Sequence, residues 1–488
     1  MEKKQDVYVQ SKLASADEAL PAGISGADDV RLAELGYKAE FRREFSLLET
    51  VAFAFSIMAV IGGVSSTLSF PLISGGHVGM VFGWGIPCLF IMCIAASMAE
   101  LASSMPTSAG LYYFSAKLAP QKYSALASWI TGWANVTGQV TLVCSIDYTV
   151  AQMITTAVAV GTDGSVKLGS GPTYGILIAL LLAHAIICSA ATKILARLNL
   201  FYGLVSTKDA FTMFENNSGW SNDGWGFLLA FTSPMWALTG YDSAAHISEE
   251  VSGAARAAPI AILVSVAAVG GLGWILMIAA SFATASVPAL LATPLALPMG
   301  QLLLDVLGKR GMLTIWSLTI ITQFLCGAAQ GVDASRVVFA FARDNALPGS
   351  RWWKRVSPRT QTPVNAVWLV MVLAALCGLL GFSATAFNSL AGASVIGLYT
   401  SYATPIFLRV TAGRQRLAPG PFSLGRWYLP VGTVATTTAQ TMNYAVVIVM
   451  AVFIFAGGSW VLSARKWFVG PLPNVELRSS TASSIEEK

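Results

Sequence analysis

Two apolar stretches of the sequence are interrupted by residues that could hold a small ligand. The first stretch contains the run Ile61-Gly62-Gly63-Val64-Ser65-Ser66-Thr67, and the second contains Ser233-Pro234 and Thr239-Gly240-Tyr241-Asp242-Ser243. Where a helix unwinds, free backbone N–H groups lie at the positive end of a half-helix and can hold a carboxylate. Glycines in membrane helices can instead simply permit close helix packing. Two breaks together favour a ligand site, because paired interrupted spans are typical of transporters with inverted repeats.

Asp242, Asp147, Glu100 and Glu249 are acidic residues that lie within or beside apolar stretches. A carboxylate near the bilayer centre costs about 3 kcal/mol on insertion scales, so Asp242 needs a reason to be there. Its presence therefore predicts a role in cation or proton handling. The alternative is that Asp242 caps the second half-helix. Asp147 is either a second polar residue of the same site or a residue near the outer interface. Glu100 and Glu249 lie at the ends of apolar stretches, so we expect them to be gate or capping residues rather than ligands.

The composition requires a membrane around these residues. Of the 488 residues 55% are hydrophobic and 11% are charged, and the mean hydropathy is +0.63. Soluble chains carry about 25% charged residues. Ten predominantly apolar stretches are each long enough to cross a hydrocarbon layer of about 30 Å as a helix, which predicts an all-α polytopic membrane protein embedded in the lipid bilayer. The expected spans are roughly 50–72, 78–99, 125–156, 174–191, 225–246, 258–283, 312–341, 363–382, 384–408 and 442–462.

Several classes of function are disfavoured. The polar first 45 residues lack the apolar core of a cleavable secretory signal. Basic residues lie between the spans and form no stripe, so they read as topology signals and predict no nucleic-acid partner. The six cysteines lie in apolar stretches without CxxC spacing, so we expect no disulfide and no metal site. Three histidines without an HxxxH box argue against a membrane-embedded enzyme, and no cofactor is predicted.

The distribution of Lys and Arg predicts two helices that are cut short. Positive residues stay on the cytoplasmic side, which places the N-terminal tail inside. Basic clusters follow the expected spans that end at residues 191 and 341, and both can be cytoplasmic only if the chain also crosses the membrane within 198–224. In that segment only Leu198–Thr207 is uncharged, and as a helix it reaches about 15 Å. The same conflict requires a crossing within 427–441. We therefore expect a cytoplasmic tail over 1–45, a transmembrane domain over 46–465 and a cytoplasmic tail over 466–488.

Four motifs resemble one known superfamily. Ala99-Glu100-Leu101 with Pro106, Gly110 and Tyr112-Tyr113 resembles a signature of the amino acid-polyamine-organocation superfamily, as does Ser335-Arg336 with Ala342-Arg343-Asp344 and Leu347-Pro348. The runs Ala245–Glu250 and Arg359–Pro363 are typical of its fungal branch of GABA, choline and other amino acid permeases. The resemblance covers about residues 40–465.

The resemblance implies a five-plus-five inverted repeat with discontinuous first and sixth helices, two further C-terminal helices, and secondary active transport. The expected substrate is an amino acid, GABA, choline or a polyamine, and the expected location is the plasma membrane. The glycine motif of the first helix would hold the substrate carboxylate, Trp236 would be the aromatic lid, and Asp242 would act in proton sensing. The expected substrate-binding residues are Ile61, Gly62, Gly63, Val64, Ser65, Trp236, Gly240, Tyr241 and Asp242.

The shortened segments set a limit on this expectation. They correspond to the family's fifth and eleventh helices, and the fifth carries the residue that couples transport to a cation. Neither Lys193 nor Lys208 lies where a mid-membrane lysine should be, so a coupling residue is not carried over, although proton coupling is compatible with Asp242. The alternatives are a truncated chain that no longer transports, or a nutrient sensor on the same scaffold. We expect ten complete spans, a loosely packed gap beside the first span, and poor transport.

Overall fold

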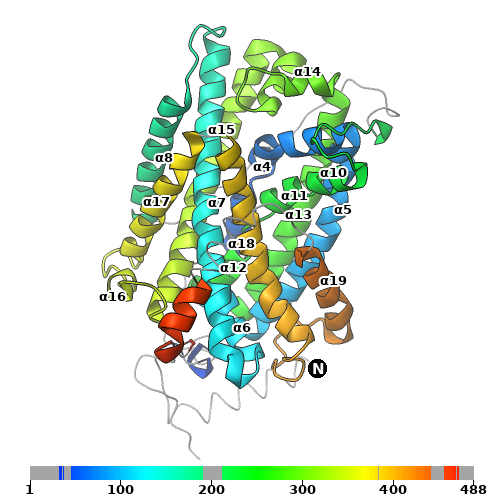
Figure 1. Ribbon diagram of the computed structural model, residues 1–488. Coiled ribbons are helices and arrows are strands. Elements are labelled where there is room, and N and C mark those ends of the chain that lie inside the picture. Colours follow the sequence, from blue (N-terminus) through cyan, green and yellow to red (C-terminus); the bar gives the residue numbers. More distant parts are fainter. Residues whose placement is uncertain are drawn as a thin grey trace, which may run out of the picture.

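The computed structural model confirms an all-helical membrane protein (Figure 1). It describes residues 32–35, 37, 45–190, 211–382, 384–440, 456–468 and 470–471, and for 190, 384–390 and 436–440 the backbone alone. Within these ranges the only β-structure is an isolated bridge between Phe45 and Val251. Seven of the described helices are long and apolar enough to cross a membrane. Helices suit this environment because a bilayer offers the backbone no hydrogen-bond partner.

The helices follow the expected spans closely. Their bounds are α3 Leu47–Met58, α4 Val60–Thr67, α5 Ser69–Ser104, α6 Gly110–Leu118, α7 Ser124–Gly161, α8 Ser170–Ala190, α10 Asp223–Ala230, α11 Thr232–Ala237, α12 Ser243–His246, α13 Ala254–Ala283, α14 Val287–Leu291, α15 Pro298–Arg343, α16 Ser350–Trp353, α17 Val364–Gly378, α18 Ala384–Val410 and α19 Tyr428–Gln440. Helix α7 packs against α15 and α18, and α5 packs against α13 and α10.

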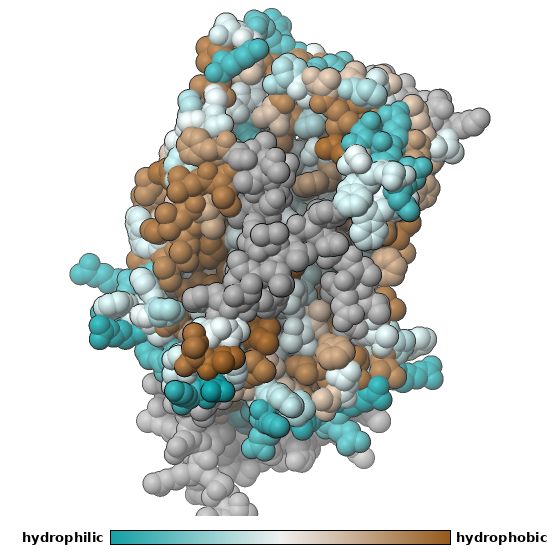
Figure 2. All heavy atoms as spheres, viewed as in Figure 1, coloured by the Kyte–Doolittle hydropathy of each residue, from teal (hydrophilic) through white to brown (hydrophobic). Residues whose placement is uncertain are grey.

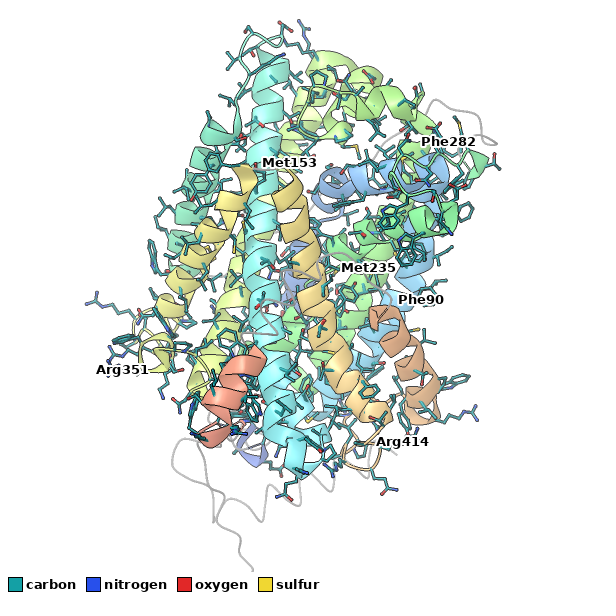
Figure 3. All side chains as sticks on the ribbon, viewed as in Figure 1. Phe90, Met153, Met235, Phe282, Arg351 and Arg414 are labelled. Carbon is teal, nitrogen blue, oxygen red and sulfur yellow. The ribbon has the colours of Figure 1, made fainter. Side chains whose placement is uncertain are left out.

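The bundle has two distinct ends. We call the end with α6, α16 and the end of α15 the basic end, and the opposite one the α14 end (Figure 1). Arg351 and Arg414 project from the basic end, whereas Phe282 lies toward the α14 end (Figure 3). Figure 2 shows hydrophobic residues gathered over the flank formed by α8 and α17, between hydrophilic residues at both ends. This is the surface pattern of a protein that spans a membrane.

Both interrupted spans are broken helices, and the position of the first break differs from the prediction. Ala59, with φ of 30°, separates α3 from α4, while Gly62 and Gly63 lie inside α4. The expectation that the chain unwinds at 61–67 is therefore wrong by a few residues. The Gly63 amide donates to the Ala59 carbonyl, so the helix resumes directly after a left-handed residue whose strain is about 1–2 kcal/mol. The second break lies at residues 238–242, where Gly240 has φ of 103°, as predicted for the run from Thr239, whereas Ser233 and Pro234 lie inside α11.

The two broken helices lie against each other. Helix α4 contacts α11, and α3 contacts α12. A Cβ atom added at Gly63 would lie 3.1 Å from the Cβ atom of Ala237, so the two backbones approach closely there. The Ser233 hydroxyl donates to the Thr67 hydroxyl at 2.8 Å on the α14 side of the breaks. Both interruptions therefore open onto one region in the middle of the bundle.

The count of ten complete spans is met only in part by the described residues. The expected span 225–246 is the broken series α10–α12, and most of the span 442–462 lies outside the described residues. Helix α19 has 13 residues, which is about 20 Å of helix.

Within the segment 198–224, residues 198–210 lie outside the described residues, and so does the expected gap beside the first span. On either side of these residues the chain lies at opposite ends of the bundle. The Ser189 carbonyl accepts a hydrogen bond from Thr362, which precedes α17, whereas the Met213 carbonyl accepts from Val78 near the start of α5.

Candidate functional site

A buried cavity of about 220 Å³ lies where the two breaks meet. Its walls come from α3, α4, α7, α11, the second break and α15. The lining residues are Ile57, Met58, Ala59, Gly63, Leu142, Ile146, Trp236, Ala237, Thr239, Gln323 and Cys326.

The break in the first helix presents two opposite helix ends to this cavity. Helix α4 begins after Ala59 and no side chain caps its N-terminus, so the N–H groups of its first turn are available to an anion. Helix α3 ends at Met58, and the last carbonyls of a helix favour a cation. A zwitterion with a carboxylate and an ammonium group matches both ends.

Gln323 is a buried polar side chain in the cavity wall that could hydrogen-bond to a ligand. It is 1% exposed, and neither its amide nitrogen nor its oxygen has a hydrogen-bond partner among the described residues. An unpartnered buried amide costs about 1–3 kcal/mol, which a ligand that hydrogen-bonds to it would offset. Gly62 packs directly on this amide, since a Cβ added there would meet the side chain of Gln323.

Trp236 closes one wall of the cavity. Its indole nitrogen donates to the Ser145 hydroxyl at 3.2 Å, which ties α11 to α7 across the site. Cys326 on α15 makes a similar tie, because its thiol donates to the carbonyl of Ile57 at 2.8 Å near the end of α3. These two hydrogen bonds join α11 to α7 and α15 to α3 at the cavity.

A buried polar cluster lies beside the second break, on the basic-end side of the cavity. Tyr402 of α18 donates to Asp242 at 2.7 Å, and His246 lies 3.3 Å from the same carboxylate. The amide of Gln139 donates to Asp242 at 3.4 Å and to Asp333 of α15 at 2.9 Å. We call these five residues the Asp242 cluster. Two carboxylates that share one buried donor repel when both are ionised, so the arrangement favours holding a proton.

Two ion pairs close the basic end. The Glu249 carboxylate in the 3₁₀ turn Ser248–Glu250 accepts from Arg343 at 3.2 Å and from the Ser108 hydroxyl at 2.5 Å. Glu250 accepts from Arg336 at 2.8 Å. Burial raises the pKa of Glu249, but Arg343 and the hydrogen bonds from Ser108 outweigh it and hold the pKa below its usual value. Glu249 therefore stays ionised and joins the 3₁₀ turn to α15 at the basic end.

Glu100 also makes polar contacts at the basic end. Its carboxylate lies 3.6 Å from Arg409 and accepts from the Ser423 hydroxyl at 3.1 Å. It thus joins the end of α5 to α18 and to the loop before α19, which agrees with a capping role.

The nine expected site residues fall into separate places. Gly63 and Trp236 line the central cavity, whereas Asp242 belongs to the polar cluster. Ile61 and Ser65 line a second, apolar cavity of about 520 Å³ between α4, α13 and α15.

The other four residues make packing contacts around the cavity. Gly62 faces Gln323, and Val64 is fully buried. A Cβ atom added at Gly240 would meet Ile57, so this glycine permits the breaks to touch. The Tyr241 ring packs on Tyr402, with ring centroids 5.1 Å apart.

The sequence contained signals for several residues that the prediction omitted. Asp333 is a carboxylate inside the apolar stretch 312–341, so the insertion cost that singled out Asp242 applies to it equally. Gln139 and Gln323 are amides within apolar stretches and give a weaker signal of the same kind. Ala59 gave no signal, because alanine is common in helices.

The broken helices, the cavity between them and the closed basic end define a membrane transporter rather than an enzyme. The Amino acid permease family model matches residues 45–469, and the chain belongs to that family. An uncharacterized amino-acid permease of Schizosaccharomyces pombe is 35% identical over 95% of this chain and 93% of its own. The Amino-acid permease BAT1 of Arabidopsis thaliana is 33% identical over 93% and 98%. The GABA-specific permease of Saccharomyces cerevisiae is 34% identical over 96% and 90%.

Each of these alignments has more positions than the number of residues that it includes from this chain. The comparison with the Schizosaccharomyces pombe relative runs over 503 residues but uses 95% of 488 residues, or about 464, so about 39 positions have no counterpart in this chain. For the GABA-specific permease the same arithmetic, 96% of 488 against 516, leaves about 48 positions. This chain is therefore shorter than its relatives inside the aligned region.

Proposed function

We propose that this chain carries a small amino acid or a related amine through the membrane by alternating access around the central cavity. The observation that carries the proposal is the uncapped start of α4, which opens on a buried cavity together with the unpartnered amide of Gln323. An anionic group would bind the first turn of α4, and an ammonium group would bind at the carbonyl end of α3. Gln323 would select between substrates of different length.

GABA is the first substrate to test. A relative that covers 96% of this chain is named a GABA-specific permease. Choline, a polyamine and neutral amino acids follow as alternatives. Choline and polyamines lack a carboxylate and would leave the start of α4 without an anion, so we rank them below GABA.

Transport in this proposal is driven by protons that bind at the Asp242 cluster. Asp242 joins α12 to α7 and α18 through Gln139 and Tyr402, so a change in its charge affects contacts among three helices. The proposed binding set is the nine residues named from the sequence, with Asp242 responsible for charge. The proposed location is the plasma membrane, with the basic end and the N-terminus in the cytoplasm.

A second candidate is a chain that binds substrate without moving it, as a truncated product or a nutrient sensor. The observation in its favour is the lack of about 39 to 48 positions relative to two relatives. A cavity without a complete set of moving helices would still bind its ligand.

Uptake of labelled substrates into a transport-deficient host separates the two candidates. The panel contains GABA, choline, a polyamine and neutral amino acids, each with and without a protonophore. Proton-coupled transport predicts accumulation of one class that the protonophore abolishes and that Gln323→Leu reduces. Wild-type chain at the cell surface that binds a substrate without accumulating it would contradict transport and favour the second candidate.

A further inference from the structure

A second buried acid–base pair lies beside the central cavity, apart from the Asp242 cluster. The Asp147 carboxylate of α7 lies 3.0 Å from Nδ1 of His184 on α8, and both side chains are fully buried. Each residue is 14 positions from the end of its helix at the α14 side, Gly161 and Ser170, or about 21 Å of helix. That depth is well inside the hydrocarbon layer. Ionisable residues there are costly and usually functional.

The pair has one unused acceptor on each member. Because Nδ1 of His184 is bonded to one carboxylate oxygen, the neutral ring carries its proton there and leaves Nε2 as an acceptor. Neither Nε2 of His184 nor the second oxygen of Asp147 has a partner among the described residues. In this state the pair carries one negative charge. One added proton on Nε2 converts it into a neutral ion pair, which is far cheaper to hold in an apolar interior.

The surroundings suit a proton rather than a metal ion. The ring of Phe324 on α15 stacks on His184 with centroids 4.4 Å apart, and an aromatic face attracts an imidazolium. Hard cations take about six or more oxygen ligands, which a carboxylate, an imidazole and a phenyl ring do not supply. Gly327 permits this approach, since an added Cβ would lie 2.6 Å from the His184 ring and would also meet Asp147.

Among the described residues, the other titratable groups that face the pair come from each helix packed around it. They are the thiols of Cys144 on α7, Cys188 on α8 and Cys326 on α15, with Cys377 of α17 beside Cys144 and Arg336 of α15 beside Cys188.

The pair is linked directly to the substrate cavity. Ile146, which precedes Asp147, lines the cavity, and so does Cys326, which precedes Gly327. The Cys326 thiol bonds to the Ile57 carbonyl near the first break. A change of charge at the pair therefore acts on two walls of the cavity and on the end of α3.

We propose that Asp147 and His184 form a proton-binding site that takes up one proton per transport cycle and couples it to the broken first helix. This rests on the proposed transport function. The proton adds to the lone pair of His184 Nε2 in one orientation of the protein and leaves from it in the other. The Asp242 cluster, which lies about 12 Å further along α7 at Gln139, is then a separate site.

The test uses His184→Gln and Asp147→Asn in the full chain, with His77→Gln as the matched control. His77 is also a buried histidine, and its Nδ1 bonds to Ser281 at 2.9 Å. Glutamine can still donate to Asp147, so the fold is kept. Purified proteins in the same detergent are titrated between pH 5 and 8 with an indicator dye, and the accumulation of labelled GABA and its exchange are measured in vesicles.

We expect wild type and His77→Gln to bind about one proton more than His184→Gln over this range. In vesicles, His184→Gln should keep GABA exchange within a few-fold of wild type, while its accumulation ratio falls well below that of wild type because one of the two proton sites is lost. Equal titration curves for wild type and His184→Gln would overturn the proposal even if Asp147→Asn does not fold. Absence of exchange in the wild type would instead count against the proposed function, because the titration is independent of transport.

Discussion

Gly63 offers the sharpest test of the central cavity, because its lack of a side chain leaves space in the cavity and allows α4 to contact α11. A Cβ atom there would lie 3.1 Å from the Cβ atom of Ala237 and 3.2 Å from the carbonyl oxygen of Met58. Carbon atoms normally pack at about 3.5–4.0 Å, so alanine forces the breaks apart by about half an ångström. Overpacking of this kind costs about 1 kcal/mol at the low end, which corresponds to about fivefold slower uptake.

A larger side chain at the same position fills the cavity itself. Gly63→Leu adds three further carbons to a space of about 220 Å³ that Gly63 lines, so we expect uptake to fall by at least about 100-fold at unchanged surface expression. The matched control is Gly271→Leu in α13, where an added Cβ would meet nothing within 4 Å. Gly63→Ala combined with Ala237→Gly should recover most of the lost rate, because the closest contact is removed.

The assay is uptake of labelled substrate normalised to surface-biotinylated protein, with the initial rate measured over a range of concentrations. Normal kinetics in well-expressed Gly63→Leu would refute the cavity as the substrate site. A loss that is explained wholly by retention inside the cell would show that Gly63 serves helix packing alone.

Three further outcomes follow from the site and its ends. Asp242→Asn keeps the shape of the Asp242 cluster and removes its charge, so it should alter the pH dependence of uptake more than the melting temperature; an unchanged pH profile at full activity would show that the charge of Asp242 is not needed for transport. Because the pKa of Glu249 is lowered in the folded protein, its ion pair stabilises the protein fully above about pH 4.5. This contribution is lost as the pH falls through the pKa that Glu249 has in the folded protein. The melting temperature of Glu249→Gln should therefore fall less than that of wild type between pH 6 and pH 3, and parallel curves would exclude the pair as a stabilising contact. Asn216, in the sequence Asn216-Asn217-Ser218 at the α14 end, should be glycosylated in a secretory-pathway host if that end faces outside, and a mass shift lost in Asn216→Gln measures it.

The all-α membrane fold and the approximate spans could be predicted because apolar length and charge alone determine which segments can cross a bilayer. The second break could be predicted as well, since Gly240 adopts a φ that other residues rarely take. The first break lies at Ala59, and nothing in its residue type distinguishes it. Glycines 62 and 63 instead serve the approach of α4 to Gln323 and Ala237, which is a tertiary contact.

The polar partners within the membrane could not be predicted from a single sequence. Asp147 was recognised as costly, but its partner His184 lies on the next helix and is brought to it only by the packing of α7 and α8. Likewise, Gln139 joins Asp242 to Asp333 across three helices. The insertion cost identifies which carboxylates need a partner, whereas the fold alone determines which residue supplies it.

Purified protein reconstituted into vesicles tests the central claim most directly, because no other transporter is present. Labelled GABA is added outside vesicles with an imposed inward proton gradient, and wild type, Gly63→Leu and protein-free vesicles are compared. The account predicts accumulation above the external concentration with wild type alone, and its collapse on addition of a protonophore. GABA that binds to wild-type protein but never enters the vesicles, or equal entry with Gly63→Leu, would contradict it.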